Sequence, residues 1–187
     1  MRVGLALPEE GILDRAGEAD AVGVWAVLVG GPAGTETARA AAVAARTRYV
    51  RVVVALDLAA EHPVTLAEEV AVLDNLAAGR AAVVLDPHTD RQRVAAFRAA
   101  LHGEVVGGVL VAPPPVQPSV PIWMGVPILA LSGDVGLDRS ALLAEHNPVA
   151  FVEWTGDLQI LARHLLPELA TVGFPRLVAE LADRFAP

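Results

Sequence analysis

The sequence contains no cysteine, which excludes a disulfide framework, a cysteine-based zinc site and a thiol nucleophile. Aromatic residues make up only 4% of the 187 residues, and the net charge is −8. Because nucleic-acid binders need basic surfaces and rings that stack on bases, both shortages argue against that function. No apolar run reaches the ~18 residues of a membrane-spanning helix, and no secretory signal pattern opens the chain. The composition predicts a soluble, cytoplasmic protein without nucleic-acid or membrane partners.

Aliphatic side chains are abundant instead. Hydrophobic residues reach 54% and charged residues only 19%, which predicts a large buried core and excludes disorder. Short Val-rich runs alternate along the chain with Ala- and Leu-rich stretches that have helical periodicity. Apolar runs typical of strands cover residues 3–7, 21–29, 50–56, 81–85, 122–124, 128–131 and 149–154. Helices are predicted over 11–19, 35–46, 65–78, 89–101, 137–146, 157–169 and 175–185.

The predicted strands are apolar without alternation, which is typical of a parallel sheet that is covered on both faces. Strands of this kind between helices predict an α/β fold. A full eight-stranded (β/α) barrel takes ~250 residues, and residues 105–131 leave no room for crossover helices. We therefore predict a single domain over residues 1–187 with a reduced, TIM-barrel-like (β/α) architecture. An open doubly wound parallel sheet is the alternative.

Two motifs are the most specific features of the chain. The first is the segment 61–80, EHPVTLAEEVAVLDNLAAGR, and the second is the segment 113–125, PPPVQPSVPIWMG, which an HGE triplet precedes at 102–104. Together they resemble the signature of the luciferase-like monooxygenase family. In that family an HP-x-x-x-AEE-x-x-x-LD-x-L-x-x-GR helix follows a barrel strand, and a PPP-x-Q…PPIW-x-G stretch comes later in the chain.

The resemblance implies a (β/α)-barrel flavoprotein that uses reduced FMN or the deazaflavin F420 on a small organic substrate. Such proteins often work with a flavin reductase and often form dimers, so the resemblance implies a flavin-dependent monooxygenase or oxidoreductase. The chain departs from the family after the strand at 81–85. A glycine-rich turn that contacts the flavin is expected there, but the sequence reads DPHTD. This departure favours a second hypothesis, a non-catalytic flavin- or metabolite-binding descendant or a partner subunit.

Candidate catalytic residues follow from the predicted strands, because the chemistry of parallel α/β folds lies at the carboxyl ends of their strands. Those ends carry Asp57, Asp86, His88 and Glu153, a set of groups able to perform acid–base chemistry. Asp86, His88 and Glu153 also allow a third hypothesis, an enzyme without a cofactor. One histidine among scattered carboxylates does not predict a metal site. The family places the position of His62 near its cofactor pocket, so the resemblance makes His62 and Asp57 candidates beside the cofactor.

The turn after the strand at 128–131 is the candidate phosphate site. Ser132 and Gly133 stand before a predicted helix, where backbone N–H groups can bind a phosphate, and Arg139 is a candidate helper. An N-cap role for Asp134 or Asp138 explains the same turn. Because acids gather near this end of the strands and the net charge is −8, we predict flavin binding weaker than the family norm.

The charged residues of the first motif are predicted to be structural. Glu68, Glu69 and Asp74 lie on a helix that flanks the barrel, away from its mouth. Arg80 stands at the start of the next strand, which in barrels is the end associated with stability, and is a candidate partner for one of these acids.

A homodimer is predicted because a shortened barrel that is 54% hydrophobic leaves apolar edges exposed. Two segments are candidates for the contact. One is the helix face that carries Leu66, Val70 and Leu73, and the other is an apolar strand over residues 105–111.

Overall fold

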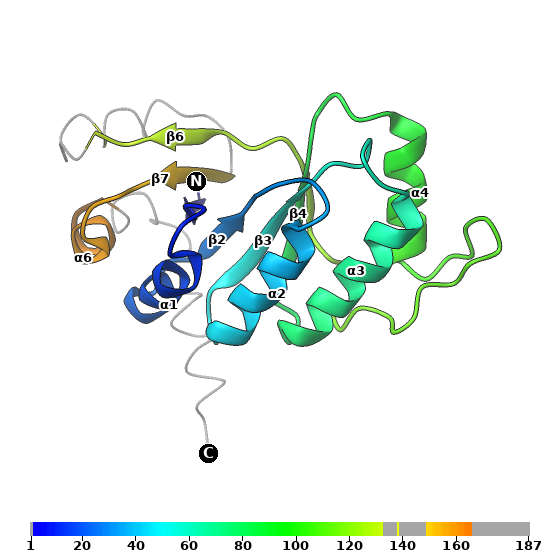
Figure 1. The fold of residues 1–187 in the computed structure, drawn as a ribbon, viewed down its shortest axis with the longest axis horizontal. Coiled ribbons are helices and arrows are strands. Elements are labelled where there is room, and N and C mark those ends of the chain that lie inside the picture. The colour runs from blue at the N-terminus through cyan, green and yellow to red at the C-terminus, as the bar shows by residue number, and fades with distance from the viewer. Residues whose placement is uncertain (1, 133–137, 139–148, 166–187) are drawn as a thin grey trace, which may run out of the picture.

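The computed structural model describes residues 2–132, 138 and 149–165. Its parallel strands form one curled sheet with helices on the outer face (Figure 1). In chain order the elements are β1 (Arg2–Ala6), α1 (Ile12–Val22), β2 (Ala26–Val29), α2 (Glu36–Arg46), β3 (Arg51–Leu56), α3 (Pro63–Leu76), β4 (Ala81–Leu85), α4 (Arg91–Leu101), β5 (Ile122–Met124), β6 (Ile128–Ala130), β7 (Val149–Glu153), α6 (Leu158–Ile160) and a π-helical turn (Leu161–Leu165).

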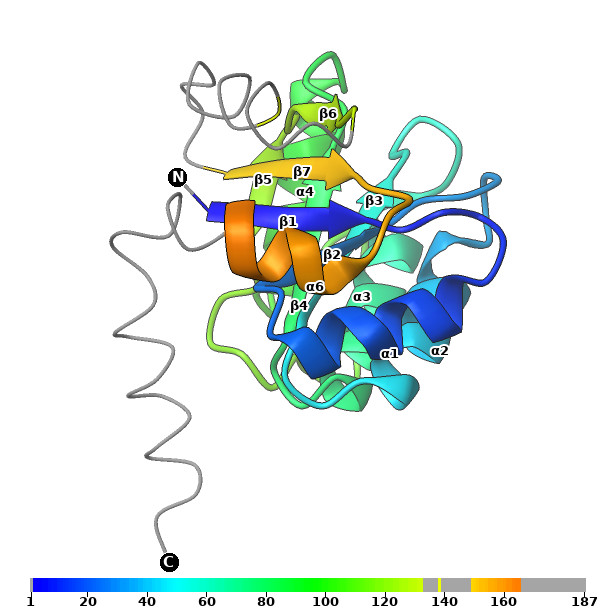
Figure 2. The same ribbon diagram turned by 90° about the vertical axis from the view of Figure 1, so that its left-hand side faces the viewer.

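The sheet has the strand order β5-β4-β3-β2-β1-β7-β6, and every neighbouring pair is parallel. Figure 2 shows β7 beside β1, which joins the late part of the chain to its start. The edge strands β5 and β6 are separated in the chain only by residues 125–127. At ~3.5 Å per residue, this connection holds the two edges within about 14 Å of each other. The sheet must therefore curl.

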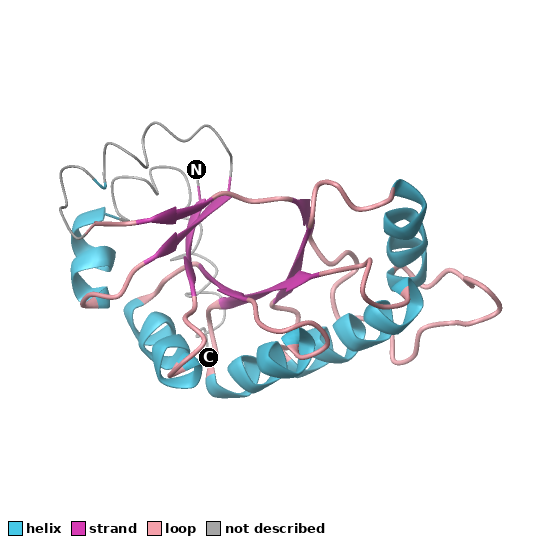
Figure 3. Ribbon diagram, turned by 45° about the horizontal axis from the view of Figure 1, so that its top comes forward, coloured by secondary structure: helices cyan, strands magenta, loops and turns pink. Residues whose placement is uncertain are grey.

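The curl decides between the two predicted architectures. In Figure 3 the strands surround a common centre and the helices lie outside them. A doubly wound sheet would carry helices on both faces. The predicted reduced, TIM-barrel-like architecture is therefore confirmed, as a curled parallel half-barrel with flanking helices.

Two apolar clusters lie on opposite faces of this sheet. Successive side chains of a strand point to opposite faces, so Val27 and Val29 of β2 enter the cluster against the helices, whereas Ala26 and Leu28 enter the inner cluster. The inner cluster also contains Val53, Ala82, Val84 and Phe151. The sheet is thus covered on both faces, and this explains why its strands are uniformly apolar.

Small residues make the inside of the curl narrow enough to be filled. A Cβ at Gly4 would lie 2.5 Å from the Phe151 ring and 2.8 Å from the carbonyl oxygen of Ala26, so only glycine fits there. Trp25 and Trp123 pack with their ring centroids 6.0 Å apart, and the Arg2 guanidinium lies 5.3 Å from the Trp25 ring. Favourable cation–π and ring contacts therefore support the inner packing.

The structure corrects some sequence predictions. Residues 105–111 form a loop with one bridge between Val106 and Val109 instead of a strand, because Gly107 and Gly108 have positive φ angles of 60° and 84°. The motif helix begins at Pro63, two residues earlier than predicted. The helices predicted over 137–146 and 175–185 fall outside the described residues. No helix within the described part of the chain is long and apolar enough to cross a membrane.

Candidate functional site

A cleft of about 620 Å³ lies at the carboxyl ends of β2, β3 and β4 and beside the connection from β5 to β6. We call it the mouth cleft. It is lined by Leu28, Glu36, Ala55, Leu56, Asp57, Ala59, Val84, Leu85, Asp86, Pro87, His88, Thr89, Gly125, Val126 and Ile128. Its volume and its place in the fold are those of a small-molecule site in a parallel α/β protein.

The floor of the mouth cleft is apolar. Leu28 and Val84 belong to the inner cluster, and Ala55 and Val126 pack against it. These four side chains come from β2, β3, β4 and the connection between β5 and β6. Because they are aliphatic and shared with the packed interior, they present a firm surface from which water is easily displaced.

The rim carries three of the predicted residues. The Oδ1 atom of Asp57 accepts a hydrogen bond from the Ala59 N–H at 2.7 Å, and the Oδ1 atom of Asp86 accepts one from the His88 N–H at 2.6 Å. Both aspartates thus form turns with their own backbone two residues on. Asp57, Asp86 and His88 are exposed and line the same cleft, so the fold does bring together these residues from the ends of β3 and β4.

Glu36 is a cleft residue that the sequence analysis missed. It is the first residue of α2, it lines the mouth cleft, and it is only 8% exposed. No hydrogen bond or ion pair joins its carboxylate to another residue of the described chain. In the sequence it looks like an ordinary acid in the first turn of a helix. Only its burial beside the cleft distinguishes it.

His62 lies outside the mouth cleft, at the N-cap of α3. Its Nδ1 atom accepts a hydrogen bond from the Val64 N–H at 3.3 Å, and Pro63 follows it as the first residue of the helix. His62 therefore has a local structural role at the helix start. Its predicted place beside a cofactor stays a prediction.

The predicted phosphate turn is described only in part. Both the N–H and the hydroxyl of Ser132 donate to Oδ1 of Asp138, at 2.7 and 2.8 Å. This fits the alternative in which Asp138 fixes the turn. Gly133, Asp134 and Arg139 lie outside the described residues, so their predicted contact with a phosphate stays a prediction.

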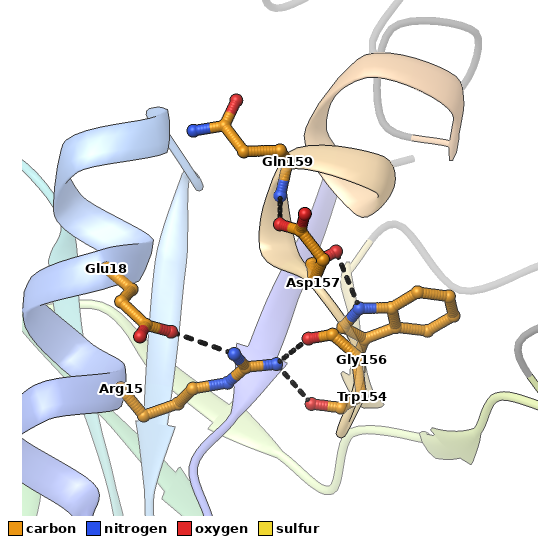
Figure 4. A network of polar contacts seen from close by, with 6 residues as sticks. All are labelled: Arg15, Glu18, Trp154, Gly156, Asp157 and Gln159. Carbon is orange, nitrogen blue, oxygen red and sulfur yellow. Dashed lines mark hydrogen bonds and ion pairs between the residues drawn. The ribbon is translucent and has the colours of Figure 1, made fainter.

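Glu153 lines a different cleft, of about 560 Å³, between the ends of β1 and β7. Arg15 of α1 crosses this region and donates to the carbonyl oxygens of Trp154 and Gly156, each at 2.7 Å, and to Glu18 at 2.8 Å (Figure 4). The structure therefore separates Glu153 from Asp86 and His88, which line the mouth cleft. Within the described residues, no group of three or more possible ligands is placed to hold a metal ion.

The basic residues near the mouth are directed elsewhere. Arg93 donates to the carbonyl oxygens of Leu58 and Glu61, at 2.5 and 2.6 Å, and so fixes the loop after β3. Arg91 and Arg98 line a neighbouring cleft of about 710 Å³ along α4. Among the described residues that line the mouth cleft, none is a lysine or arginine.

The two sequence motifs meet at the opposite end of the strands. Asp74 of α3 is fully buried, and its carboxylate accepts from the backbone N–H and the side-chain amide of Gln117, at 2.9 and 2.7 Å. Asn75 donates to the carbonyl oxygen of Pro114 at 2.8 Å. Conserving this join requires the LD pair of the first motif and the PPP-x-Q of the second, so both motifs are structural here.

The predicted partner of Arg80 is wrong within the described residues. The buried guanidinium donates to the carbonyl oxygens of Ala44, Thr47 and Val50, at 3.3, 3.0 and 2.6 Å. The described chain shows no ion pair between Arg80 and an acid of α3. Arg80 therefore ties β4 to the end of α2.

Comparisons with known proteins give likenesses of structure alone. No family model and no curated protein matches the chain. It resembles the monooxygenase RslO1 from Streptomyces bottropensis, with 25% identity over 80% of this chain and 59% of that one, at a TM-score of 0.57. It also resembles the coenzyme F420-dependent tetrahydromethanopterin reductase from Methanopyrus kandleri, with 14% identity over 80% of this chain and 55% of that one, at a TM-score of 0.55.

A third similar structure is a type II Baeyer–Villiger monooxygenase in complex with FMN, the oxygenating constituent of 3,6-diketocamphane monooxygenase from the CAM plasmid of Pseudomonas putida. The identity is 14% over 91% of this chain and 62% of that one, at a TM-score of 0.53. The chain thus spans 55–62% of the length of these three structures. Their shared curled (β/α) fold confirms the resemblance to the luciferase-like monooxygenase family that the two motifs predict.

Proposed function

We propose that the chain is an oxidoreductase that holds a flavin-type cofactor, FMN or F420, in the mouth cleft and acts there on a small organic substrate. The observation that carries the proposal is the apolar-floored cleft at the carboxyl ends of the strands in this fold. The similar structures support it, because they are two monooxygenases, one of them in complex with FMN, and a coenzyme F420-dependent reductase.

The described residues fit the ring of such a cofactor. Leu28, Ala55, Val84 and Val126 offer an aliphatic surface for a flat heterocycle, and a volume of about 620 Å³ leaves room for a large ring system. When bound, the reduced ring supplies the hydride or oxygen chemistry. The chain positions it, excludes water with the apolar floor, and presents the His88 imidazole as an acid or base. We expect a separate flavin reductase to supply reduced cofactor.

The rim suits the phosphate of FMN less well. Asp57 and Asp86 stand there with the buried Glu36, and the lining has no arginine or lysine within the described chain. The N–H groups of Ala59 and His88 are already donated to the two aspartates. Like charges near a phosphate weaken its binding. We therefore expect a flavin affinity below the family norm, and protein that is colourless on purification unless cofactor is added.

This rim also favours the second candidate function, a non-catalytic protein that binds a metabolite in the same cleft. The observation behind it is the same trio of carboxylates without a basic counterpart. The two candidates differ in one respect. The oxidoreductase binds FMN or F420 and turns over with it, whereas the metabolite binder retains its ligand unchanged.

The test is a titration of the full chain with FMN and with F420, followed by absorbance and fluorescence. Ala55→Trp fills the floor of the cleft, and we expect it to weaken cofactor binding by at least about ten-fold. Ala45→Trp, on the exposed side of α2, is the matched control and should bind as the unchanged chain does. Failure of both cofactors to bind would refute the oxidoreductase. Purification with stoichiometric yellow FMN would refute only the expected weak affinity.

A further inference from the structure

The buried carboxylate of Glu36 needs a partner that the described chain does not supply. Its residue is 92% buried by the 8% exposure given above, and no hydrogen bond or ion pair to a described residue satisfies it. Burying an ionised carboxylate without a partner is costly, and such groups in proteins are paired or bind a ligand. Because Glu36 lines the mouth cleft, a ligand in that cleft can reach it.

The charges around Glu36 select the sign of that ligand. Asp57 and Asp86 line the same cleft, and each uses one carboxylate oxygen for its own turn. The only side chain of the described lining that can carry a positive charge is His88. A cleft with three carboxylates has a negative potential that its apolar walls strengthen. It therefore attracts a cation and repels an anion.

The floor selects the rest of the ligand. Leu28, Ala55 and Val84 present only aliphatic surface, which favours an apolar body over a sugar or a polar chain. A compact cation such as a metal ion would leave this surface unused, and no metal-ligand group is found among the described residues. The arrangement of Glu36 above an apolar floor matches a molecule with one apolar part and one positive group.

We propose that the mouth cleft binds a small organic amine, with its ammonium group on the Glu36 carboxylate and its apolar part on the floor. The amine is then the organic substrate of the proposed oxidoreductase, and in that sense the inference rests on the proposed function. The binding itself requires no cofactor. It therefore has a readout separate from turnover.

Another role for Glu36 is helix stabilisation. A negative side chain in the first turn of a helix favours the partial positive charge at its N-terminus. This role alone predicts that Glu36 affects stability and has no effect on which ligands bind. The choice between the two roles is therefore a question of ligand selectivity.

The first experiment uses the unchanged full chain and three probes of nearly equal shape: benzylamine, benzyl alcohol and benzoate. Their binding at neutral pH is measured by calorimetry without FMN or F420. We expect benzylamine to bind at least about ten-fold more tightly than benzyl alcohol, and benzoate to bind least. Equal affinities for the amine and the alcohol, or a preference for benzoate, would overturn the proposal. Because no variant is needed, a folding defect cannot obscure this result.

The second experiment assigns the effect to one side chain. Glu36→Gln removes the charge with little change of shape, and it should weaken benzylamine binding at least about ten-fold while leaving benzyl alcohol unchanged. Glu104→Gln, at an exposed position outside the cleft, is the matched control. Unchanged benzylamine binding in Glu36→Gln would overturn the assignment. If benzylamine binds through Glu36 and neither cofactor binds, only the oxidoreductase fails; if a cofactor binds and benzylamine does not, only the amine site fails.

Discussion

Asp74 explains, at the level of one side chain, why two distant motifs occur together in this chain. Its buried carboxylate receives the backbone N–H and the side-chain amide of Gln117 and the N–H of Ala81, at 2.9, 2.7 and 3.3 Å. The Gln117 amide also donates to the carbonyl oxygen of Ala81 at 2.8 Å. One acid therefore ties α3, β4 and the proline-rich loop together. Its role is stability, because the mouth cleft lies at the other end of β4.

We predict that Asp74→Ala lowers the free energy of unfolding by roughly 3 kcal/mol, since it leaves buried donors of Gln117 and Ala81 unsatisfied. Asp74→Asn keeps one acceptor oxygen and should cost less. Thermal and urea unfolding measure both changes, with Glu104→Gln as the exposed control. A loss in Asp74→Ala no larger than that of the control would contradict this role.

Glu69 offers a milder test of the same structural reading of the motif. It accepts a hydrogen bond from the Thr37 hydroxyl of α2 at 2.5 Å, and both groups are partly buried. Glu69→Gln should lower stability by at most about 1 kcal/mol and leave cofactor and amine binding unchanged. Glu68→Gln, whose carboxylate makes no hydrogen bond within the described chain, is the control. Loss of ligand binding in Glu69→Gln with an unchanged melting temperature would show that the motif helix acts in the site.

At the scale of elements, Arg15 fixes α1 against the connection from β7 to α6. Its guanidinium donates to two carbonyl oxygens of that connection, Trp154 and Gly156. The Trp154 ring nitrogen in turn donates to the carbonyl oxygen of Asp157 at 3.1 Å, and the Asp157 side chain accepts from the Gln159 N–H at 2.7 Å (Figure 4). One side chain from the start of the chain therefore orders the start of α6.

Arg15→Met keeps most of the apolar stem and removes the charged donors. We expect a loss of about 1–3 kcal/mol, because hydrogen bonds to charged groups contribute about that much, and faster amide exchange in residues 154–160 than in β3. Glu18→Gln removes only the exposed half of the Arg15–Glu18 pair and should change stability by less than about 1 kcal/mol. Uniform exchange rates in Arg15→Met would indicate that this contact does not order the connection.

The strands and most helices were predictable, because each strand is a continuous aliphatic run that needs cover on both faces. The predicted ranges 81–85 and 122–124 coincide with β4 and β5. The strand predicted over 105–111 is wrong because the apolar count of that run concealed the Gly107-Gly108 pair, whose positive φ angles turn the backbone. Composition predicts what a segment buries, but the backbone angles of two glycines decide whether it extends.

The site was predictable only where strand ends determine it. Asp57 and Asp86 follow β3 and β4 directly, so parallel pairing places them at one edge. Glu36 comes from a helix that starts six residues after β2 ends, and its burial depends on how the glycine-rich connection at 30–34 folds back. No periodicity in the sequence contains that information. The same limit applied to Asp74, which the motif pattern placed on the outer face and the structure buries.

At the scale of the whole molecule, the apolar surface points to a contact other than the α3 face. Leu66, Val70 and Leu73 were predicted as one dimer surface, but they are 4%, 0% and 1% exposed and pack in the core. The other candidate segment, residues 105–111, is a loop with exposed aliphatic side chains. It is therefore the remaining candidate surface for self-association.

We predict that the chain is a homodimer in solution that uses this loop. Val105 is 66%, Leu110 57% and Val109 43% exposed, and neighbouring exposed aliphatic side chains of this kind favour burial against a partner. Light scattering at micromolar concentration should give twice the chain mass of 19.4 kDa. Leu110→Glu places a charge in the contact and should shift the protein to monomer. Leu13→Glu, at a 40% exposed position on α1, should leave the dimer intact, so a monomer mass for the unchanged chain, or an equal shift in both variants, would exclude this loop as the interface.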